Sequence, residues 1–300
     1  MKVLVTGGFG FIGSSVVKNL EEKGVKVVIL DNFSSSNFKN IPFFKGELII
    51  GDITDKGLFK KLGRFDAVVH EAAITDTTIK DDNLMLRVNY EGFKNILGFC
   101  LDKKIRLVYA SSAGVYGNAD GPAKETQAVN PLNTYAFSKA LCDRLVLSIK
   151  IPKNFTLVGL RYFNVYGPGE AHKKKSASMI YQLYLQMKEG QRPRIFKFGE
   201  QKRDFIYIRD VARITLKALE FKGKAIINVG TGRARSFNDI IDILNKNLKT
   251  NLLADYFDNP YKGVYQDFTQ ADTRNLDKLL GVRAEFSLEE GIKDYLKQLC

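Results

Sequence analysis

The stretch TGGFGFIG, residues 6–13, decides the fold of this sequence. It follows a short apolar run and leads into a helical pattern, so it stands where a strand turns into a helix. Gly7 permits a tight turn, Gly10 lets the backbone approach a pyrophosphate, and Gly13 lets the helix pack close to the strand. The first N–H groups of the helix then point at the phosphates. The stretch predicts a dinucleotide-binding turn, to which we also assign Phe11 and Ile12.

An acidic residue strengthens this prediction. Asp31 lies 18 residues beyond Gly13, at the end of the second apolar run, where a carboxylate can bind ribose hydroxyls and favours NAD. Asn32 and Lys39, with the serines between them, offer donors that suit the 2′-phosphate of NADP. The choice between the two cofactors therefore stays open. Asp52 is a candidate contact on the adenine side, or an ordinary cap at the end of a strand.

Strand and helix patterns alternate through the first half of the chain. This alternation, with strands that read as buried on both faces, predicts right-handed crossovers and a parallel sheet. The expected fold is a Rossmann-type doubly wound α/β sheet. The expected strands are residues 2–6, 25–30, 47–50, 67–70, 106–110 and 156–160, and the expected helices are residues 12–22, 58–62, 84–101 and 135–149.

The rhythm changes after residue 167. Helical patterns at 177–189, 237–248 and 288–299 are separated by irregular segments and by short strands near 205–208 and 226–229. We expect an NAD(P)-binding domain over residues 1–166, with its sheet completed by parts of 202–232. Residues 167–300 would form a smaller, interleaved substrate lobe, with the active site in the cleft at the carboxyl ends of the strands.

Composition narrows the class of protein. The 46 basic and 33 acidic residues give a net charge of +13, which suits nucleic acid, a phosphate-rich small molecule, or simply a solvated lysine-rich surface. RNA-binding signatures are missing, so we expect no nucleic-acid partner. Apolar runs far shorter than a membrane span, and a chain that opens directly on a strand, predict a cytoplasmic protein without a membrane partner.

The sequence gives no sign of a metal centre. The three cysteines, Cys100, Cys142 and Cys300, lack the spacing of a disulfide framework or a zinc site. The two histidines are too few for a metal cluster. His70 is expected to be a packing residue at a strand end.

Three residues form the candidate catalytic group. Ser112 follows a predicted strand, and Tyr135 and Lys139 stand four residues apart in YAFSK. This spacing places Tyr135 and Lys139 one turn apart on one helical face, so the ammonium lowers the pKa of the phenol and helps to hold the nicotinamide ribose. Tyr135 would transfer the proton, and Ser112 would hydrogen-bond the carbonyl or alkoxide oxygen.

Together these motifs resemble the extended short-chain dehydrogenase/reductases, which modify nucleotide sugars by transient oxidation. The segments HEAAITDTT (70–78), RYFNVYGPGEAHKKKSAS (161–178), KRDFIYIRDVA (202–212), GTGRARSF (230–237) and KGVYQDFTQAD (262–272) are similar to the ADP-L-glycero-D-manno-heptose 6-epimerase family. The resemblance covers essentially the whole chain. It implies substrate contacts and cofactor-seating residues; the implied substrate residues are Asn164, Lys173, Arg203 and Tyr265, with Phe196 nearby, and the implied cofactor residues are Asn89 and Lys139, to which we add Ala72 and Ala73.

The resemblance places a catalytic lysine at Lys173. Returning hydride to the opposite face of a carbonyl needs a proton donor that one fixed tyrosine does not supply, so Lys173 would be a second acid/base. Lys174 and Lys175 would lower its pKa by repulsion. The alternative is a phosphate ligand in a solvated basic loop. His172 would orient substrate or be a solvated loop residue.

Departures from the family pattern leave the sugar open. Lys174 and Lys175 replace a Gly-Ser pair, and Gln182 stands where a histidine is expected. The position after Ser112 reads Ala113-Gly114 and not the acidic pair of a dehydratase, which disfavours elimination of water.

The expected function is that of a nucleotide-sugar epimerase, first of all one that inverts C6 of ADP-heptose through a 6-keto intermediate. One NAD or NADP per chain would be used without net consumption, and the resemblance implies a homo-oligomer. A UDP- or GDP-sugar 4-epimerase or reductase is the alternative. A non-catalytic dinucleotide sensor or RNA-binding protein is the alternative of another class, and the intact Ser112, Tyr135 and Lys139 argue against it.

Overall fold

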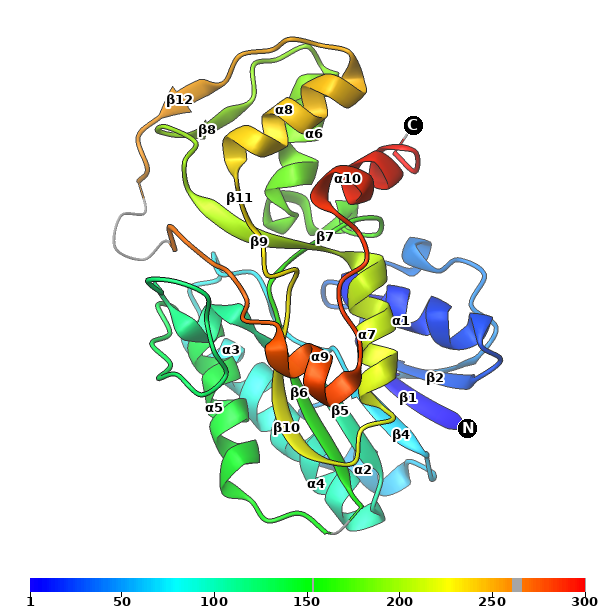
Figure 1. Ribbon diagram of the computed structural model, residues 1–300. Coiled ribbons are helices and arrows are strands. Elements are labelled where there is room, and N and C mark those ends of the chain that lie inside the picture. Colours follow the sequence, from blue (N-terminus) through cyan, green and yellow to red (C-terminus); the bar gives the residue numbers. More distant parts are fainter. Residues whose placement is uncertain (153, 261–265, 300) are drawn as a thin grey trace.

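The computed structural model describes residues 1–152, 154–260 and 266–299. Within these residues the chain builds a seven-stranded sheet in the order β10-β6-β5-β4-β1-β2-β3. All of its strand pairs are parallel, which confirms the predicted doubly wound fold (Figure 1). Its strands are β1 (Lys2–Thr6), β2 (Lys26–Asp31), β3 (Glu47–Ile50), β4 (Ala67–His70), β5 (Arg106–Ser112), β6 (Thr156–Tyr162) and β10 (Gly223–Val229).

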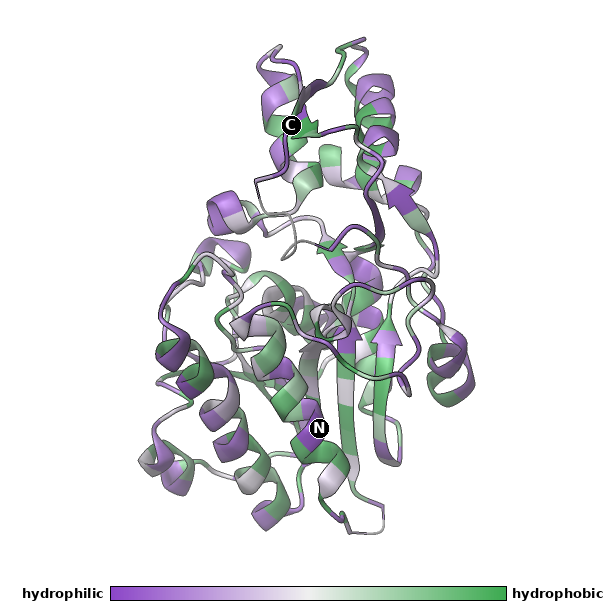
Figure 2. Ribbon diagram, turned by 90° about the vertical axis from the view of Figure 1, so that its left-hand side faces the viewer, coloured by the Kyte–Doolittle hydropathy of each residue, from purple (hydrophilic) through white to green (hydrophobic). Residues whose placement is uncertain are grey.

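Helices cover both faces of this sheet. One face packs on α1 (Phe11–Glu22) and α7 (Ile208–Ala218), and the other on α4 (Gly92–Lys103) and α5 (Thr134–Ser148). Alternate residues of β1 divide between the two cores: Val3 and Val5 join the first, Leu4 the second. A strand buried on both sides reads as a continuous apolar run, which is why the sequence revealed these strands. Figure 2 shows apolar stretches along the central strands.

The expected helix over residues 84–101 is divided in the structure. It consists of α3 (Asp82–Leu86), a wider π-helical turn (Arg87–Glu91) and α4. The wide turn contains Asn89, whose amide hydrogen-bonds outside the helix, to the backbone of Ile74. Such turns are often found near functional sites. A short helix, α2 (Lys56–Lys61), precedes β4.

A second region lies beyond the carboxyl ends of the main strands (Figure 1). The described residues of this region form two small sheets and three α-helices. The sheets are β11-β9-β7 and β12-β8, made of β7 (Asn164–Tyr166), β8 (Arg194–Phe196), β9 (Lys202–Tyr207), β11 (Ala234–Ser236) and β12 (Asp255–Phe257), and the helices are α6 (Met179–Lys188), α8 (Phe237–Leu248) and α10 (Leu288–Leu296). The chain enters this region after β6 and returns to the main sheet for α7, β10 and α9 (Arg274–Leu280).

Two of the α-helices in the described part of the chain were not predicted. The strand expected at 205–208 ends at Tyr207, and Ile208 already begins α7. The sequence does carry the signal, because Ile208, Val211 and Thr215 recur at helical spacing and are all buried against α1 and the sheet. The short apolar run IYI masked this period. Helix α9 is only seven residues long, too short for a reliable pattern. No helix among the described residues is both long and apolar enough to cross a lipid bilayer.

Candidate active site

The glycine-rich turn between β1 and α1 is shaped to admit a diphosphate. Gly7 has φ +67°, and a Cβ there would lie 2.8 Å from Cα of Ala72. A Cβ on Gly13 would lie 2.1 Å from the carbonyl oxygen of Gly7. Helix α1 begins after Gly10 without a side-chain cap and without an acidic residue in its first turn. Its first N–H groups, those of Phe11 and Ile12 among them, are thus left for a ligand, which fits the pyrophosphate of a dinucleotide.

Asp31 ends β2 beside this turn. Its carboxylate is buried and accepts hydrogen bonds from the N–H groups of Phe9 and Phe33 at 3.0 and 2.9 Å, and from the Ser36 hydroxyl at 2.8 Å. These bonds fix the carboxylate at the end of the strand, where the acid of a dinucleotide fold binds a ribose.

Asn32 and Asp52, which follow β2 and β3, are in contact. The amide of Asn32 donates to Asp52 at 3.1 Å. Burial raises the pKa of Asp52, but hydrogen bonds from Thr54 and Asn32 outweigh it, so that its pKa is lowered and the carboxylate is favoured. Lys39 is exposed in a short 3₁₀ turn (Phe38–Asn40). Both NAD and NADP are therefore compatible with these residues.

The loop after β4 lies against the turn. The N–H of Ala72 donates to Thr6 at 3.4 Å, and Ala73 follows in the same loop. Asn89 is 1% exposed, and its amide bonds the backbone of Ile74 and the hydroxyl of Ser138. Both polar atoms of this amide bond the backbone of Ile74, and its nitrogen also reaches Ser138 on α5. A direct part in seating the cofactor remains a prediction.

The three candidate catalytic residues lie at the junction of β5 and α5. A Cβ on Gly114 would contact both Ser112 Oγ, at 3.3 Å, and Ala136 Cβ, at 3.4 Å, so the strand end adjoins the first turn of α5. Ser112 and Tyr135 are half-buried, and the Ser112 Oγ accepts the N–H of Gly114 at 3.1 Å. Its hydroxyl proton remains for a ligand.

A backbone carbonyl of β5 holds the side chain of Lys139 in place. It is 3% exposed, and its ammonium donates to the carbonyl oxygen of Ala110 at 2.8 Å. The same nitrogen lies 6.0 Å from the centroid of the Tyr135 ring. The predicted pairing of ammonium and phenol on one helical face is thus compatible with the geometry.

Burial and the positive charge of Lys139 shift the pKa of two residues at the end of β4. His70 is buried, its Nδ1 lies 2.7 Å from the Thr6 hydroxyl, and burial lowers its pKa to about 3. It packs on Phe93, as expected of a strand-end residue. Burial raises the pKa of Glu71 to about 7, against the opposite effects of a hydrogen bond with Tyr162 and of Lys139. Sequence reasoning missed Glu71, although a charged residue directly after a buried strand was a signal.

A 3₁₀ segment (Ala171–Ser176) lies over the glycine-rich turn. The Lys173 ammonium is 5.6 Å from the centroid of the Phe11 ring, in the first turn of α1. The pKa of Lys173 is lowered, as expected, but the expected cause is wrong. Lys174 and Lys175 are exposed. Burial lowers the pKa of Lys173, and the nearby carboxylates of Glu170 and Asp76 raise it.

His172 is linked to the glycine-rich turn through Asn40. Its Nδ1 accepts from the Asn40 amide at 3.3 Å, and the same amide donates to the carbonyl of Phe9 at 3.0 Å. Burial lowers the pKa of His172, which favours the neutral ring. The predicted contact with substrate therefore competes with a structural role beside the turn.

The remaining candidate substrate residues come from the second region. Asn164 starts β7, and its Oδ1 accepts from Thr269 at 3.1 Å. Arg203, on the neighbouring strand β9, is 5% exposed and donates to the backbone of Lys202 and Gln266. Phe196 packs on Phe257 in the β12-β8 sheet, at a ring distance of 5.0 Å. Tyr265 lies outside the described residues.

Of the three cysteines, two lie in the described residues, and Cys300 lies outside them. Cys100 and Cys142 are buried, and burial raises the pKa of the Cys142 thiol to about 12. In residues 1–152, 154–260 and 266–299, no three His, Cys, Asp or Glu side chains gather as a metal site would require.

Comparison with known proteins agrees with this geometry. The model of the family described as NAD dependent epimerase/dehydratase matches residues 3–230. The ADP-L-glycero-D-manno-heptose 6-epimerase of Helicobacter pylori superposes with a TM-score of 0.92 at 41% identity, over 99% of this chain and 96% of that one.

Two 4-epimerases are also similar. The UDP-N-acetylglucosamine 4-epimerase of Methanobrevibacter ruminantium gives a TM-score of 0.92 at 31% identity, over 99% of this chain and 97% of that one. A UDP-glucuronic acid 4-epimerase variant of Bacillus cereus, solved with a fluorinated UDP-sugar and NAD, gives 0.88 at 31% identity over the whole of both chains.

Proposed function

This chain belongs to the NAD-dependent epimerase/dehydratase family and is a nucleotide-sugar epimerase, and on that premise we propose that it inverts C6 of ADP-glycero-manno-heptose. The observation that carries the choice of sugar is the 41% identity to a heptose 6-epimerase over 99% of the chain, against 31% to the 4-epimerases. The segments that first indicated this substrate lie in both regions of the fold, around β9, the 3₁₀ segment at Ala171–Ser176 and the loop after β4.

The glycine-rich turn, the N-terminus of α1 and Asp31 would hold the cofactor. Their backbone N–H groups and buried carboxylate suit a diphosphate and a ribose. The chemistry that NAD or NADP would supply there is reversible transfer of a hydride, so that no net oxidant would be consumed.

Tyr135 would take the proton of the C6 hydroxyl as the alcohol is oxidised. The ammonium of Lys139, fixed by the carbonyl oxygen of Ala110, lies 6.0 Å from the centroid of the phenol ring and would orient Tyr135 and the cofactor. Ser112 would donate its hydroxyl to the developing carbonyl oxygen, since its own oxygen already accepts from Gly114. Because C6 lies outside the sugar ring, rotation about C5–C6 presents the other face of the carbonyl.

Lys173 would supply the proton on that second face. It stands on a segment separate from α5, which carries Tyr135. Burial lowers its pKa, which makes proton exchange easier near neutrality. The alternative role, a ligand for diphosphate, is supported by its position above the first turn of α1. The contact with Phe11 is compatible with both.

A UDP-sugar 4-epimerase is the second candidate, favoured by the likeness to two such enzymes. Inversion at C4 requires the whole sugar ring to turn within the site, whereas inversion at C6 requires one bond to rotate. Purified protein incubated with ADP-, UDP- and GDP-sugars, with products identified by NMR, separates the two. Conversion of ADP-heptose alone supports our proposal, and conversion of a UDP-sugar alone refutes it. A homo-oligomer remains a prediction, and both NAD and NADP remain candidates for the cofactor.

A further inference from the structure

One buried side chain joins the two ends of the segment that carries Lys173. Glu170 is 0% exposed, and its Oε1 accepts the N–H of Gly167 at 3.0 Å and the hydroxyl of Ser178 at 2.9 Å. Its Oε2 accepts the N–H of Ser178 at 2.5 Å. Gly167 precedes the 3₁₀ segment (Ala171–Ser176), and Ser178 follows it as the N-cap of α6. We call these three hydrogen bonds the Glu170 clamp.

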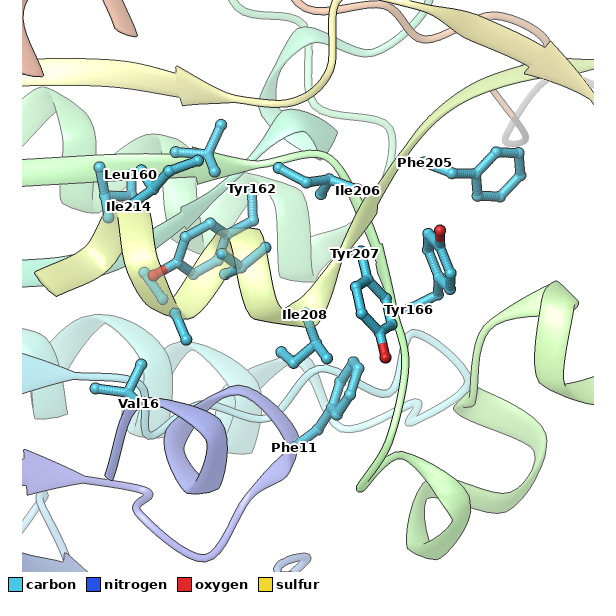
Figure 3. Packing of buried hydrophobic residues seen from close by; sticks show 14 of the residues in the cluster. Phe11, Val16, Leu160, Tyr162, Tyr166, Phe205, Ile206, Tyr207, Ile208 and Ile214 are labelled. Carbon is cyan, nitrogen blue, oxygen red and sulfur yellow. The ribbon is translucent and has the colours of Figure 1, made fainter. Parts of the chain in front are cut away.

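The chain is packed closely where the segment begins. Tyr166 ends β7 and packs on Tyr207 with ring centroids 5.4 Å apart. A Cβ on Gly167 would lie 2.5 Å from the side chain of Ile208, so the backbone runs directly against α7 there. In Figure 3, Tyr166 lies beside Tyr207. The same view places Phe11, the ring under the lysine ammonium, beside Ile208, in the same buried cluster.

The interior of the segment has a fixed shape. The N–H of Lys173 donates to the carbonyl oxygen of Glu170 at 2.9 Å. Lys174 has φ +51° and ψ −118°, a conformation that side-chain-bearing residues rarely adopt. Its carbonyl accepts the N–H of Ala177 at 3.1 Å, and the Gln182 amide on α6 donates to the Ala177 carbonyl at 3.1 Å. A residue keeps such a conformation only where its surroundings hold it, so the kink directly after Lys173 indicates a segment that is held at both ends.

We propose that Glu170 is a positioning residue for Lys173: its clamp closes the segment and so holds the lysine amine over Phe11 and the first turn of α1. The consequence for catalysis rests on the proposed function, whereas the placement of the amine does not. Without the clamp, both ends of the segment stay attached to the fold, but its middle gains freedom and the amine moves toward solvent.

Two substitutions weaken the clamp to different degrees. Glu170→Gln has one acceptor oxygen, so an NH₂ group faces a donor that the carboxylate accepted. Ser178→Ala removes the hydroxyl, which also caps α6, and leaves the N–H; Ser178→Thr keeps a hydroxyl and is the conservative rescue. Asp210→Asn is the matched control, because this carboxylate is also 0% exposed and accepts the N–H groups of Glu285 and Phe286, outside the segment.

Lysine acetylation tests the placement without any substrate. The cofactor-loaded protein is treated briefly with acetic anhydride, and the labelled positions are identified by tandem mass spectrometry. Lys174 and Lys175 are exposed and serve as references within the same peptide, and half-buried Lys173 should react more slowly than both. Glu170→Gln should raise the relative rate at Lys173 on the order of threefold, and Asp210→Asn should leave it unchanged. An unchanged relative rate in Glu170→Gln overturns the proposal.

Kinetics test the consequence for catalysis. Glu170→Gln should lower kcat for epimerisation on the order of 10²-fold, the cost of misplacing one reacting group, with little change in KM. Reduction of bound cofactor by substrate should continue, since it does not need Lys173. Ser178→Ala should show the same pattern to a smaller degree, and Ser178→Thr should restore it. Asp210→Asn should affect both steps in proportion.

The failures of the two proposals are distinguishable. Equal loss of epimerisation and cofactor reduction in Glu170→Gln would make Glu170 a general structural residue and overturn its positioning role. If Glu170→Gln does not fold, Ser178→Ala and Ser178→Thr provide both comparisons, and equal rates at Lys173 in these two variants and the wild type overturn the proposal. If no nucleotide sugar is converted, the proposed function fails, and acetylation still decides whether Glu170 places Lys173.

Discussion

The ammonium of Lys173 lies 5.6 Å from the centroid of the Phe11 ring, although 162 positions separate the two residues in the chain. This contact brings the segment that carries the proposed second acid/base onto the first turn of the dinucleotide helix. The loop is therefore not simply a solvated basic surface. Because of this position, a substitution of Lys173 is the sharpest test of a mechanism with two acid/base residues.

Lys173→Met should abolish epimerisation while the first half-reaction survives. The methionine keeps much of the apolar stem against Phe11 but cannot deliver a proton to the rotated carbonyl oxygen. Reduction of bound cofactor by substrate, followed by its absorbance, should continue through Tyr135. Lys174→Met, at an exposed neighbour, is the matched control and should epimerise normally. Normal epimerisation by Lys173→Met with weakened substrate binding would make Lys173 a phosphate ligand.

Tyr135→Phe should lower turnover by roughly 10²- to 10⁴-fold, because it removes the proton-transferring hydroxyl and keeps the ring. Cofactor binding should persist, since Lys139 and the glycine-rich turn are unchanged. Tyr256→Phe, whose hydroxyl bonds Asn238 far along the second region, serves as the control. Turnover of Tyr135→Phe equal to that of the wild type would remove Tyr135 from its assigned role.

The sequence indicated those parts of this arrangement that are local. The TGGFGFIG turn, the buried strands and the Tyr135-Lys139 spacing each depend on neighbouring residues, and their positions followed from short-range geometry. The contacts of Tyr162 with Glu71 and Thr215 depend on strands and a helix that are distant in sequence and become neighbours only after folding. The reason for the lowered pKa of Lys173 was wrong for the same reason, since burial is a property of the fold.

Gly13→Ala should weaken NAD binding and destabilise the fold. Its Cβ would lie 2.1 Å from a backbone oxygen that cannot rotate away, so the turn itself must shift, at a cost of about 1–3 kcal/mol. Calorimetric titration with NAD and thermal unfolding measure the two effects. Gly98→Ala in α4, where a Cβ meets nothing within 4 Å, should be neutral or slightly stabilising. Equal behaviour of the two variants would contradict this account of the turn.

Acid should destabilise the protein through His70. Its pKa is about 3 in the folded protein and about 6.5 when unfolded, so the unfolded chain takes up a proton that the folded one refuses. The free energy of unfolding should fall as pH decreases from 6.5 toward 3, by about 5 kcal/mol at most. Denaturant titrations of the wild type and His70→Gln across this range would show it. A wild-type slope no steeper than that of the variant would exclude the effect.

The central claim is that C6 of the heptose is oxidised and reduced again within one site. The most direct measurement is the fate of deuterium placed at C6 of ADP-glycero-manno-heptose and followed by NMR in ordinary water. We predict that the product has inverted configuration at C6 and keeps the deuterium there, because the bound cofactor returns the hydride it received. Replacement of the label by solvent hydrogen, or inversion at any carbon other than C6, would contradict the account.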